Sequence, residues 1–462
     1  MFNGTVSASY EFLLPKSNIF CRMRRMKPSK PQQPAATKMP DWQRSGAQHV
    51  WMPYTQMQTS PLPIAVERTE DVYLILADGR RLIDGLASWW TACHGYNHPH
   101  IRAAVEYQLR KMPHVMLGGI HHEPALRLAA RLASLLPGDL NHVFFCDSGS
   151  VAVEIAMKMA VQYWLNRGFP QRTKFVSFEH AYHGDTTGAM SVCDPTGSMH
   201  AQFKGILLEQ ISVKIPKSHA ELGQFNQILK TQSDQIAAVI IEPLIQGAGG
   251  MKFHAQEILA DIRNACLRHD LLFIADEIAT GFGRTGTMFA CEQAAVVPDI
   301  ICFGKALTGG TMSLAATVAT DRVYSAFLSV DPSHALMHGP TFMANPLACA
   351  AANASLDLFE REPRLEQVAE IEKTLLRHLA ECRDLPGVVD VRCKGAVGVI
   401  QVETLGEVDE LRRRFVDNGV WLRPFRDMIY LTPPLSITAE QLTELCERTC
   451  ETVSQWQNEL SR

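Results

Sequence analysis

Short apolar runs that stop abruptly at polar or small residues recur along the first two thirds of the chain. Each run has the length and composition of a strand that is buried on both faces of a parallel sheet. The runs lie at residues 144–146, 175–178, 237–241, 271–275 and 300–303. A helix is predicted after the first run, because apolar residues then recur every four positions, at Val151, Ile155, Met159 and Tyr163. Together these elements indicate an α/β fold.

Smaller elements are predicted on either side of this region. Residues 72–76 and 80–84 read as two strands joined by an Asp-Gly turn. A long helical stretch, 346–381, leads back to a C-terminal α+β unit, in which 419–424 and 429–434 flank a turn. We therefore expect a second, smaller structural unit beside the α/β region.

Two of the predicted strands end next to chemically reactive side chains. Residues 271–275 run directly into Asp276, and residues 300–303 are followed, after Gly304, by Lys305. Ligands bind at the carboxyl ends of strands in open α/β sheets, so Asp276 and Lys305 are expected to face one crevice. Pyridoxal phosphate (PLP) chemistry needs this pair: a lysine amine bonds to the aldehyde and moves protons, while a carboxylate keeps the pyridine nitrogen protonated.

Taken singly, each residue has a structural explanation, the aspartate as a helix cap or ion-pair partner and the lysine as a chain that reaches water. The surrounding segments favour chemistry. Residues 275–277, 281–286 and 303–310 closely resemble the signature of fold-type I, class III PLP-dependent aminotransferases. The resemblance implies a large PLP-binding domain at 86–344, with a mostly parallel seven-stranded sheet between helices. It also implies a smaller α+β domain built from 41–85 and 345–462.

Two other motifs suggest sites that we reject. The segment GFGRTG at 281–286 has the glycine spacing of a dinucleotide fingerprint, but five residues separate it from the preceding strand, whereas a Rossmann turn follows its strand directly. His94, His98 and His100 match no compact zinc pattern, and Pro99 between them predicts a helix start. We therefore predict neither a nicotinamide site nor a metal site.

Composition limits the remaining classes of protein. The 462 residues are 46% hydrophobic and 20% charged, with a net charge of -4, which gives no broad basic face for nucleic acid. No apolar run approaches the length of a membrane span. The twelve cysteines are scattered without a C-x-x-C pair, as expected in a reducing compartment. The sequence thus predicts a cytoplasmic enzyme with small-molecule substrates.

Residues 1–40 differ from the rest of the chain. They contain seven Lys or Arg residues against a single Glu, a bias typical of transit peptides, but no continuous apolar region for secretion. Met23, Met26 and Met39 offer later starts for translation. We favour a disordered or wrongly assigned extension that adds nothing to function. The mass of the native protein would decide between these interpretations.

The resemblance also assigns roles to residues outside the Asp276 and Lys305 segments. Small residues that open a helix leave N–H groups free for a phosphate, which fits Gly149 and Ser150. In the family, Tyr182 lies beside the cofactor ring, and Pro340 and Thr341 contact the phosphate from the partner subunit, which implies a homodimer with shared active sites. Lys305 is the catalytic residue and Asp276 the partner of the pyridine nitrogen.

Within the family, six segments resemble those members that transfer an amino group from S-adenosylmethionine to 8-amino-7-oxononanoate during biotin synthesis. They are residues 49–54, 88–90, 94–99, 181–186, 308–312 and 338–343. This resemblance implies that Tyr54, Trp89, Tyr182, Lys305 and Gly339 line the substrate pocket and that Arg423 binds the carboxylate of the keto acid. Aromatic walls suit a sulfonium cation and a flat adenine.

Alternatives stay open at this point. Another ω-aminotransferase, acting on ornithine, 4-aminobutyrate or a diamine, would keep Lys305 and Asp276 but change the aromatic set. A non-catalytic PLP-binding protein could keep the fold, because fold does not fix function. Lysine could replace S-adenosylmethionine as the amino donor. Glu242, at the end of the 237–241 run, is either a structural residue or a carboxylate supporting the site.

Overall fold

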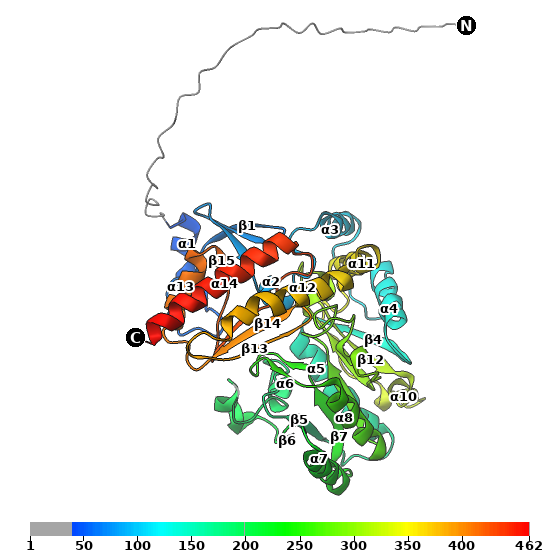
Figure 1. Ribbon diagram of the computed structural model, residues 1–462. Coiled ribbons are helices and arrows are strands. Elements are labelled where there is room, and N and C mark those ends of the chain that lie inside the picture. The colour runs from blue at the N-terminus through cyan, green and yellow to red at the C-terminus, as the bar shows by residue number, and fades with distance from the viewer. Residues whose placement is uncertain (1–38, 198, 462) are drawn as a thin grey trace, which may run out of the picture. The chain divides into compact units, whose positions relative to one another are not determined.

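A seven-stranded sheet organises the part of the chain that the structure describes, residues 39–197 and 199–461 of a computed structural model (Figure 1). The strand order is β4-β12-β11-β10-β7-β5-β6, and only β12 runs antiparallel to its neighbours. The strands are β4 (Leu140–Cys146), β5 (Lys174–Phe178), β6 (Ile211–Val213), β7 (Ile236–Ile241), β10 (Leu272–Asp276), β11 (Ile300–Phe303) and β12 (Ala315–Thr320). The predicted mostly parallel α/β sheet is confirmed.

Helices cover both faces of this sheet, which explains why its central strands are apolar throughout. Alternate residues of β10 point to opposite sides. Leu272 and Ile274 pack in one cluster with α5 (Gly149–Asn166), whereas Phe273 and Ala275 pack in the other with α8 (Gln256–Arg268). All five residues of β10 are buried. The two-sided burial predicted for this strand is therefore present.

Two smaller sheets form the second unit. One has the order β1-β2-β3-β15 and the other β13-β14-β16. α12 covers the second sheet, and α14 lies beside α12 (Figure 1). The strands are β1 (Val66–Glu70), β2 (Tyr73–Leu76), β3 (Arg81–Asp84), β13 (Val388–Lys394), β14 (Val397–Val402), β15 (Val420–Trp421) and β16 (Met428–Leu431). Because β3 pairs with β15, the unit joins both ends of the described chain. Its mixed α and β content agrees with the predicted smaller domain, whose boundaries stay a prediction.

The prediction of one long helical stretch at 346–381 is wrong in one respect, because the structure has two helices there. α11 (Pro346–Arg361) ends before Glu362, whose backbone is extended, and α12 (Arg364–Leu379) starts after Pro363. Proline removes a helical N–H and disfavours helical geometry in the residue before it, so the chain breaks there. The break separates the helix that packs on α3 (Pro99–Lys111) from the one that covers β14.

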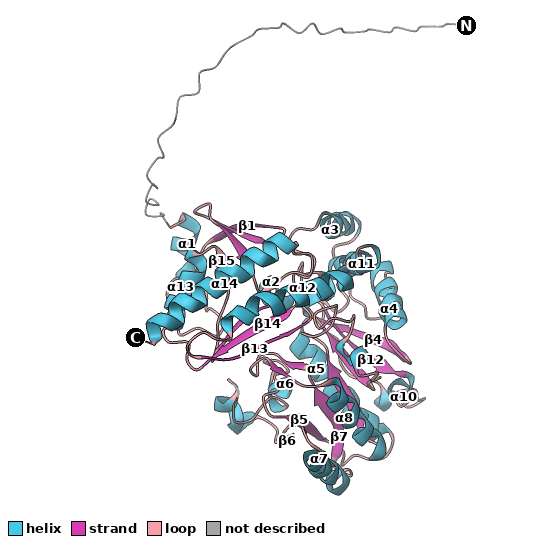
Figure 2. Cartoon of the chain, viewed as in Figure 1, coloured by secondary structure: helices cyan, strands magenta, loops and turns pink. Residues whose placement is uncertain are grey.

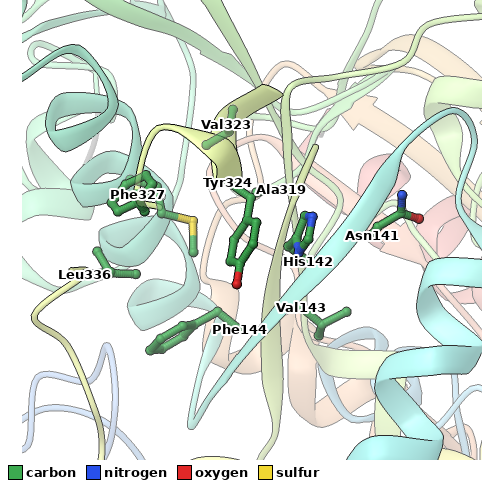
Figure 3. A pocket seen from close by; sticks show the side chains of 10 residues that line it. Asn141, His142, Val143, Phe144, Ala319, Val323, Tyr324, Phe327 and Leu336 are labelled. Carbon is green, nitrogen blue, oxygen red and sulfur yellow. The ribbon is translucent and has the colours of Figure 1, made fainter. Parts of the chain in front are cut away.

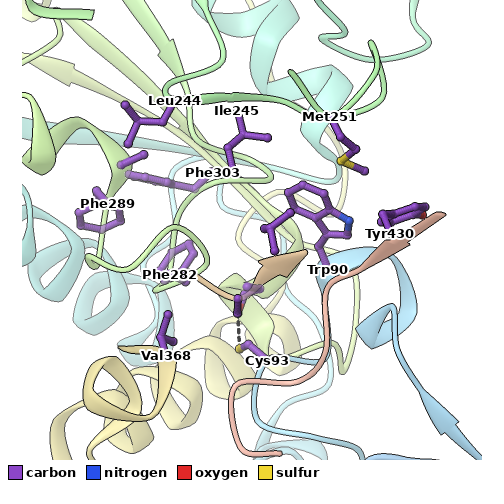
Figure 4. Packing of buried hydrophobic residues seen from close by; sticks show 14 of the residues in the cluster. Trp90, Cys93, Leu244, Ile245, Met251, Phe282, Phe289, Phe303, Val368 and Tyr430 are labelled. Carbon is purple, nitrogen blue, oxygen red and sulfur yellow. Dashed lines mark hydrogen bonds between the residues drawn. The ribbon is translucent and has the colours of Figure 1, made fainter. Parts of the chain in front are cut away.

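A cluster of aromatic side chains packs behind the segment that carries Lys305. The ring centroid of Phe303 lies 5.6 Å from that of Phe282 and 5.0 Å from that of Phe289 (Figure 4). The thiol of Cys93 donates to the carbonyl of Ala306, 3.6 Å away, which ties the neighbouring loop to the residue after the lysine. The lysine therefore follows a strand that ends in a packed aromatic cluster.

The remaining helices surround these sheets, as the colouring by secondary structure in Figure 2 shows. They are α1 (Asp41–Gly46), α2 (Ala87–Trp90), α4 (Glu123–Leu135), α6 (Thr187–Ser191), α7 (His219–Gln232), α9 (Ala290–Gln293), α10 (Asp321–Ser325), α13 (Val408–Asp417) and α14 (Ala439–Leu460), and a short hairpin pairs β8 (Ile245–Gln246) with β9 (Lys252–Phe253).

Among the described residues no helix combines the length and apolar character needed to cross a bilayer. The predicted N-terminal extension lies outside the described residues, except for Met39 and Pro40.

Candidate active site

The predicted meeting of Asp276 and Lys305 occurs. Strands β10 and β11 are parallel neighbours, with Asp276 opposite Cys302, so the residues that follow both strands lie at one edge of the sheet. Asp276 and Lys305 both line a cavity of about 510 Å³. The aspartate is only 4% exposed. An acid and an amine thus line the same cavity, as PLP chemistry requires.

Asp276 is held by hydrogen bonds to both carboxylate oxygens. Nδ1 of His183 lies 2.7 Å from Oδ2, and the N–H of Ile278 donates to Oδ1 over 3.1 Å. Burial acts to lower the pKa of His183, but the hydrogen bond and charge of Asp276 raise it above its usual value. The raised pKa favours the protonated imidazolium of His183, which can donate from Nδ1 to Oδ2 of Asp276. His183 is a site residue that the sequence analysis did not assign.

Lys305 is held in a form suited to bond formation. It opens the short helix η3 (Lys305–Thr308) with a left-handed φ of 42°. Removal from water lowers the pKa of its amine, although the negative charges of Asp276 and Glu242 oppose the shift. A lowered pKa increases the fraction of neutral amine, which is the nucleophilic and basic form.

The residues predicted to form a phosphate cradle lie at the N-terminus of α5. Ser148 caps the helix, and Gly149 and Ser150 form its first residues and line the cavity. The Oγ of Ser150 accepts a hydrogen bond of 3.0 Å from the N–H of Asp185, which fixes the hydroxyl. An anion at this helix end meets free N–H groups and the positive end of the helix dipole. Together with Lys305 and the buried Asp276, this cradle fits pyridoxal phosphate.

Gly184 makes a close approach to this cradle, which gives a testable prediction. A Cβ added there would lie 2.2 Å from Oγ of Ser150, at a left-handed φ of 127°. Gly184→Ala is expected to displace Ser150, to weaken PLP binding about tenfold and to lower the free energy of unfolding by about 1–3 kcal/mol. Absorbance titration with PLP and thermal unfolding measure the two effects.

Gly223→Ala is the matched control, because a Cβ at this position in α7 meets no atom within 4 Å. Alanine has the higher helix propensity, so this variant should bind PLP normally and unfold at an equal or higher temperature. Normal PLP affinity in Gly184→Ala would contradict the role given to this close approach.

Asp185 connects two of the predicted aromatic residues. The hydroxyl of Tyr54 donates to Oδ2 over 2.5 Å, and that of Tyr182 donates to Oδ1 over 2.9 Å. The two tyrosine oxygens lie 3.4 Å apart. Tyr54 comes from a segment 128 residues before Tyr182, so the carboxylate fixes two distant parts of the chain against one cavity. Asp185 was missed, although it lies in the 181–186 segment and only three residues after Tyr182.

The two tryptophans line the cavity from a left-handed turn. Residues 87–90 have φ values of 45°, 47°, 57° and 72°, and the carboxylate of Asp84 stabilises the turn by accepting from the N–H groups of Leu86 and Ser88. The turn directs Trp89 and Trp90 differently: Trp90 is 6% exposed and Trp89 is 41% exposed. Both line the cavity, as the predicted aromatic wall requires.

Arg423 lies at the same wall. Its guanidinium carbon is 5.0 Å from the centre of the Trp89 ring, and the Tyr54 ring meets Trp89 edge-on at 6.2 Å. Burial, followed by the nearby charge of Arg412, lowers the pKa of Arg423. A half-buried cation against aromatic rings is a suitable receptor for a carboxylate. The predicted position of Arg423 in the pocket therefore agrees with the structure.

Glu242 supports the cavity wall through the backbone. Its carboxyl oxygens accept from the N–H of Tyr182 over 3.0 Å and from the N–H of Gly247 over 2.9 Å. Burial raises the pKa of Glu242 to about 7, while the charge of His183 opposes the shift. Glu242 thus holds Tyr182 in place, and it also borders the cavity.

The raised pKa of Glu242 predicts a pH-dependent stability. The folded protein binds this proton more tightly than the unfolded chain, whose glutamate has a pKa of about 4.3. Stability contributed by the neutral carboxyl is therefore lost as pH rises towards 7. Between pH 5.5 and 7 the free energy of unfolding of the PLP-free protein should fall by about 2 kcal/mol relative to Glu242→Gln. Denaturant titrations of both proteins across this range give the difference, and parallel pH profiles would contradict it.

Gly339, Pro340 and Thr341 do not line this cavity within one chain. They lie on a surface segment, where Gly339 and Thr341 are exposed and the neighbouring Phe342 is 56% exposed. Their predicted role across a dimer places them in the partner's site, so this arrangement agrees with that role but does not test it. The phosphate contact of Pro340 and Thr341 and the substrate contact of Gly339 stay predictions.

A second cavity, of about 370 Å³, lies between β4, β12 and α10 (Figure 3). Its lining is mainly apolar, with the ring of His142 stacked on Tyr324 at 3.7 Å and bound to Asp321 at 2.8 Å. No lysine and no carboxylate are among its lining residues. The cavity around Lys305 is therefore the candidate active site.

Comparison with known proteins points to the same chemistry. A family model described as aminotransferase class-III matches residues 54–453. The adenosylmethionine-8-amino-7-oxononanoate aminotransferase of Corynebacterium glutamicum is 45% identical over 403 residues, covering 86% of this chain and 95% of the relative. The Saccharomyces cerevisiae protein of that name is 36% identical over 461 residues, covering 90% of this chain and 96% of the relative.

Solved structures agree. The crystal structure of the adenosylmethionine-8-amino-7-oxononanoate aminotransferase from Methanocaldococcus jannaschii superposes with a TM-score of 0.86 at 35% identity, over 90% of this chain and 98% of that chain. An amine transaminase from an uncultivated Pseudomonas species, in a PLP-bound form, gives a TM-score of 0.81 at 30% identity, over 88% of this chain and 98% of that chain.

Proposed function

The chain belongs to the class-III aminotransferase family, and from this membership we propose that it transfers the amino group of S-adenosylmethionine to the ketone of 8-amino-7-oxononanoate, forming 7,8-diaminononanoate for biotin synthesis. The observation that carries the proposal is the cavity in which Lys305 and Asp276 meet the tyrosine pair and Arg423. Relatives that carry the corresponding enzyme name extend over most of the chain.

PLP, when bound, supplies an aldehyde that accepts the amino group and a ring that withdraws electrons. The protein's residues perform the remaining tasks. Lys305 would hold the aldehyde and move a proton at the substrate carbon, Asp276 would stabilise a protonated pyridine nitrogen, and the α5 N-terminus would bind the phosphate. Because donor and acceptor use the same cavity in turn, the proposed kinetics are ping-pong.

The substrates fit the walls of the cavity. A sulfonium cation next to the rings of Tyr54 and Trp89 gains cation–π attraction, and adenine can stack on an aromatic face. The acceptor is a C9 chain with one distant carboxylate, and it needs an apolar channel that ends at a cation. Arg423 supplies that cation, since it has no hydrogen-bonded or ion-paired partner among the described residues.

The proposed enzyme is a cytoplasmic homodimer. Unpaired thiols throughout the described residues support a reducing compartment. The exposed positions of Thr341 and Phe342 support the dimer, because these residues can reach a neighbouring subunit.

Mixed dimers of Lys305→Ala and Thr341→Ala test the shared site. If Thr341 acts in the partner's site, each mixed dimer contains one site with both residues intact, so co-expression should restore roughly half of the wild-type activity per dimer. If both residues act within one chain, every site lacks one of them. Activity no higher than that of the separate variants would therefore contradict the shared site.

The function itself is tested in two half-reactions. Protein loaded with PLP is mixed with S-adenosylmethionine alone, and the yellow colour of the cofactor should disappear. Addition of 8-amino-7-oxononanoate should restore it and yield 7,8-diaminononanoate. Bleaching by lysine but not by S-adenosylmethionine would overturn the proposed donor, and a protein that bleaches with ornithine or 4-aminobutyrate would be a different ω-aminotransferase.

A further inference from the structure

A second arginine stands beside Arg423 in the active-site cavity. Arg412 comes from α13, whereas Arg423 follows β15, and both line the cavity together with Pro424 and Tyr430. The spacing of the two arginines in the sequence does not predict that they line the same cavity. Their meeting depends on how α13 packs next to β15 in the smaller unit.

Arg412 is fixed at two points. Its Nη1 donates to Oδ1 of Asp409 over 2.9 Å, and its Nη2 donates to the carbonyl of Pro424 over 3.3 Å. The side chain is 31% exposed, and its Nε is buried without an acceptor among the described residues. One of the two points is the carbonyl of Pro424, the residue directly after Arg423. Arg412 therefore holds the backbone that carries the carboxylate receptor.

The charges at this wall are not balanced. Asp409 pairs with Arg412, but no described carboxylate lies within ion-pair distance of Arg423. Two guanidinium groups that face one cavity repel each other, and an anionic ligand removes this repulsion. The remaining positive charge favours a ligand with a carboxylate over an uncharged ligand of the same shape.

We propose that Arg412 is a positioning and specificity-determining residue for the amino acceptor: it holds the turn after Arg423 and supplies a second positive charge for the acceptor's carboxylate. The inference rests on the proposed function, because it takes the acceptor to be a keto acid whose carboxylate is distant from the reacting ketone. It assigns Arg412 no part in the chemistry at Lys305.

Arg412→Met keeps the aliphatic stem and removes the charge. We expect the KM for 8-amino-7-oxononanoate to rise about tenfold, with kcat within about twofold of wild type, since a charged hydrogen-bonding group is lost. The KM for the methyl ester of this acceptor should change less than about twofold, because the ester has no charge to bind. Arg412→Lys should recover part of the loss for the acid.

Asp409→Asn distinguishes the effect of the charge of Arg412 on the acceptor from its effect in holding the turn after Arg423. Removal of the carboxylate leaves Arg412 unneutralised, so the KM for the acid should stay equal or fall if the charge of Arg412 acts on the acceptor. If Asp409 and Arg412 serve only as a brace for the turn, both variants should raise the KM for acid and ester alike. That result would overturn the inference.

Calorimetry with nonanoate gives a readout independent of catalysis, because this C9 carboxylate has no ketone to react. We expect Arg412→Met to bind nonanoate about tenfold more weakly than wild type, and equal affinities would overturn the inference. Failure of wild-type protein to convert 8-amino-7-oxononanoate, with the nonanoate difference intact, would instead overturn the proposed function and leave the carboxylate site standing.

Discussion

Lys305→Ala is expected to lower turnover by at least about 10⁴-fold, because it removes both the amine that bonds to PLP and the group that moves the proton. The variant should still bind PLP, since the α5 N-terminus and Asp276 are unchanged. Borohydride reduction followed by peptide mass spectrometry should add the mass of the cofactor to the peptide that contains Lys305 in wild type. The same peptide of the variant should stay unlabelled.

The stability of Lys305→Ala distinguishes a catalytic lysine from a structural one. Removal from water lowers the pKa of Lys305, so its charged form is unfavourable in the folded protein. The melting temperature of the PLP-free variant should therefore equal or exceed that of wild type. Lys252→Ala, on the exposed side of β9, is the control and should keep full activity and labelling. Labelling at another lysine, or turnover near wild type, would contradict the assignment of Lys305.

The sequence was most informative where strands end. The run before Asp276 and the run before Lys305 are apolar because helices bury both faces of the sheet, and the strand direction then determines where the next polar residues lie. Two local patterns therefore sufficed to place Asp276 and Lys305 in one cavity. For the same reason, the small residues after β4 line that cavity as well, and their contact with phosphate stays a prediction.

Contacts between distant segments could not be predicted in this way. Arg412 and Arg423 meet only through the packing of α13 against β15, and the single carboxylate of Asp185 joins Tyr54 to Tyr182. No periodic pattern in the sequence predicts the turn at 87–90 either. Its four successive left-handed residues depend on hydrogen bonds to the buried carboxylate of Asp84. Resemblance to the family indicated Trp89 and Arg423, but not the groups that hold them.

Family resemblance identified one set of residues that a single chain does not bring together. Gly339, Pro340 and Thr341 do not line the Lys305 cavity within one chain, and their role in a partner's site stays a prediction. The break between α11 and α12, by contrast, could have been predicted from the sequence alone. Pro363 disfavours helical geometry in the residue before it, which was sufficient reason to predict two helices in place of one.

Asp276→Asn is the second variant with a large expected effect. The carboxylate of Asp276 is buried and lies 2.7 Å from Nδ1 of His183. In the proposed mechanism it would stabilise the positive charge of a protonated pyridine nitrogen. An amide of the same shape cannot stabilise that positive charge, so turnover should fall about 10³-fold, comparable to the loss of a preorganised electrostatic group in other enzymes. Stopped-flow measurement of the donor half-reaction and the pH dependence of the bound cofactor's visible absorbance should both change.

Glu277→Gln provides the control for this prediction, because Glu277 follows Asp276 directly but serves the fold. Its carboxylate is fully buried and accepts from the hydroxyl of Thr280 and the N–H groups of Ala290 and Cys291. Glu277→Gln should lower stability, since an amide cannot accept all these bonds, while the cofactor's absorbance and its pH dependence stay as in wild type. Equal spectral changes in both variants would show that disturbance of the β10 terminus, and not the charge of Asp276, controls the cofactor.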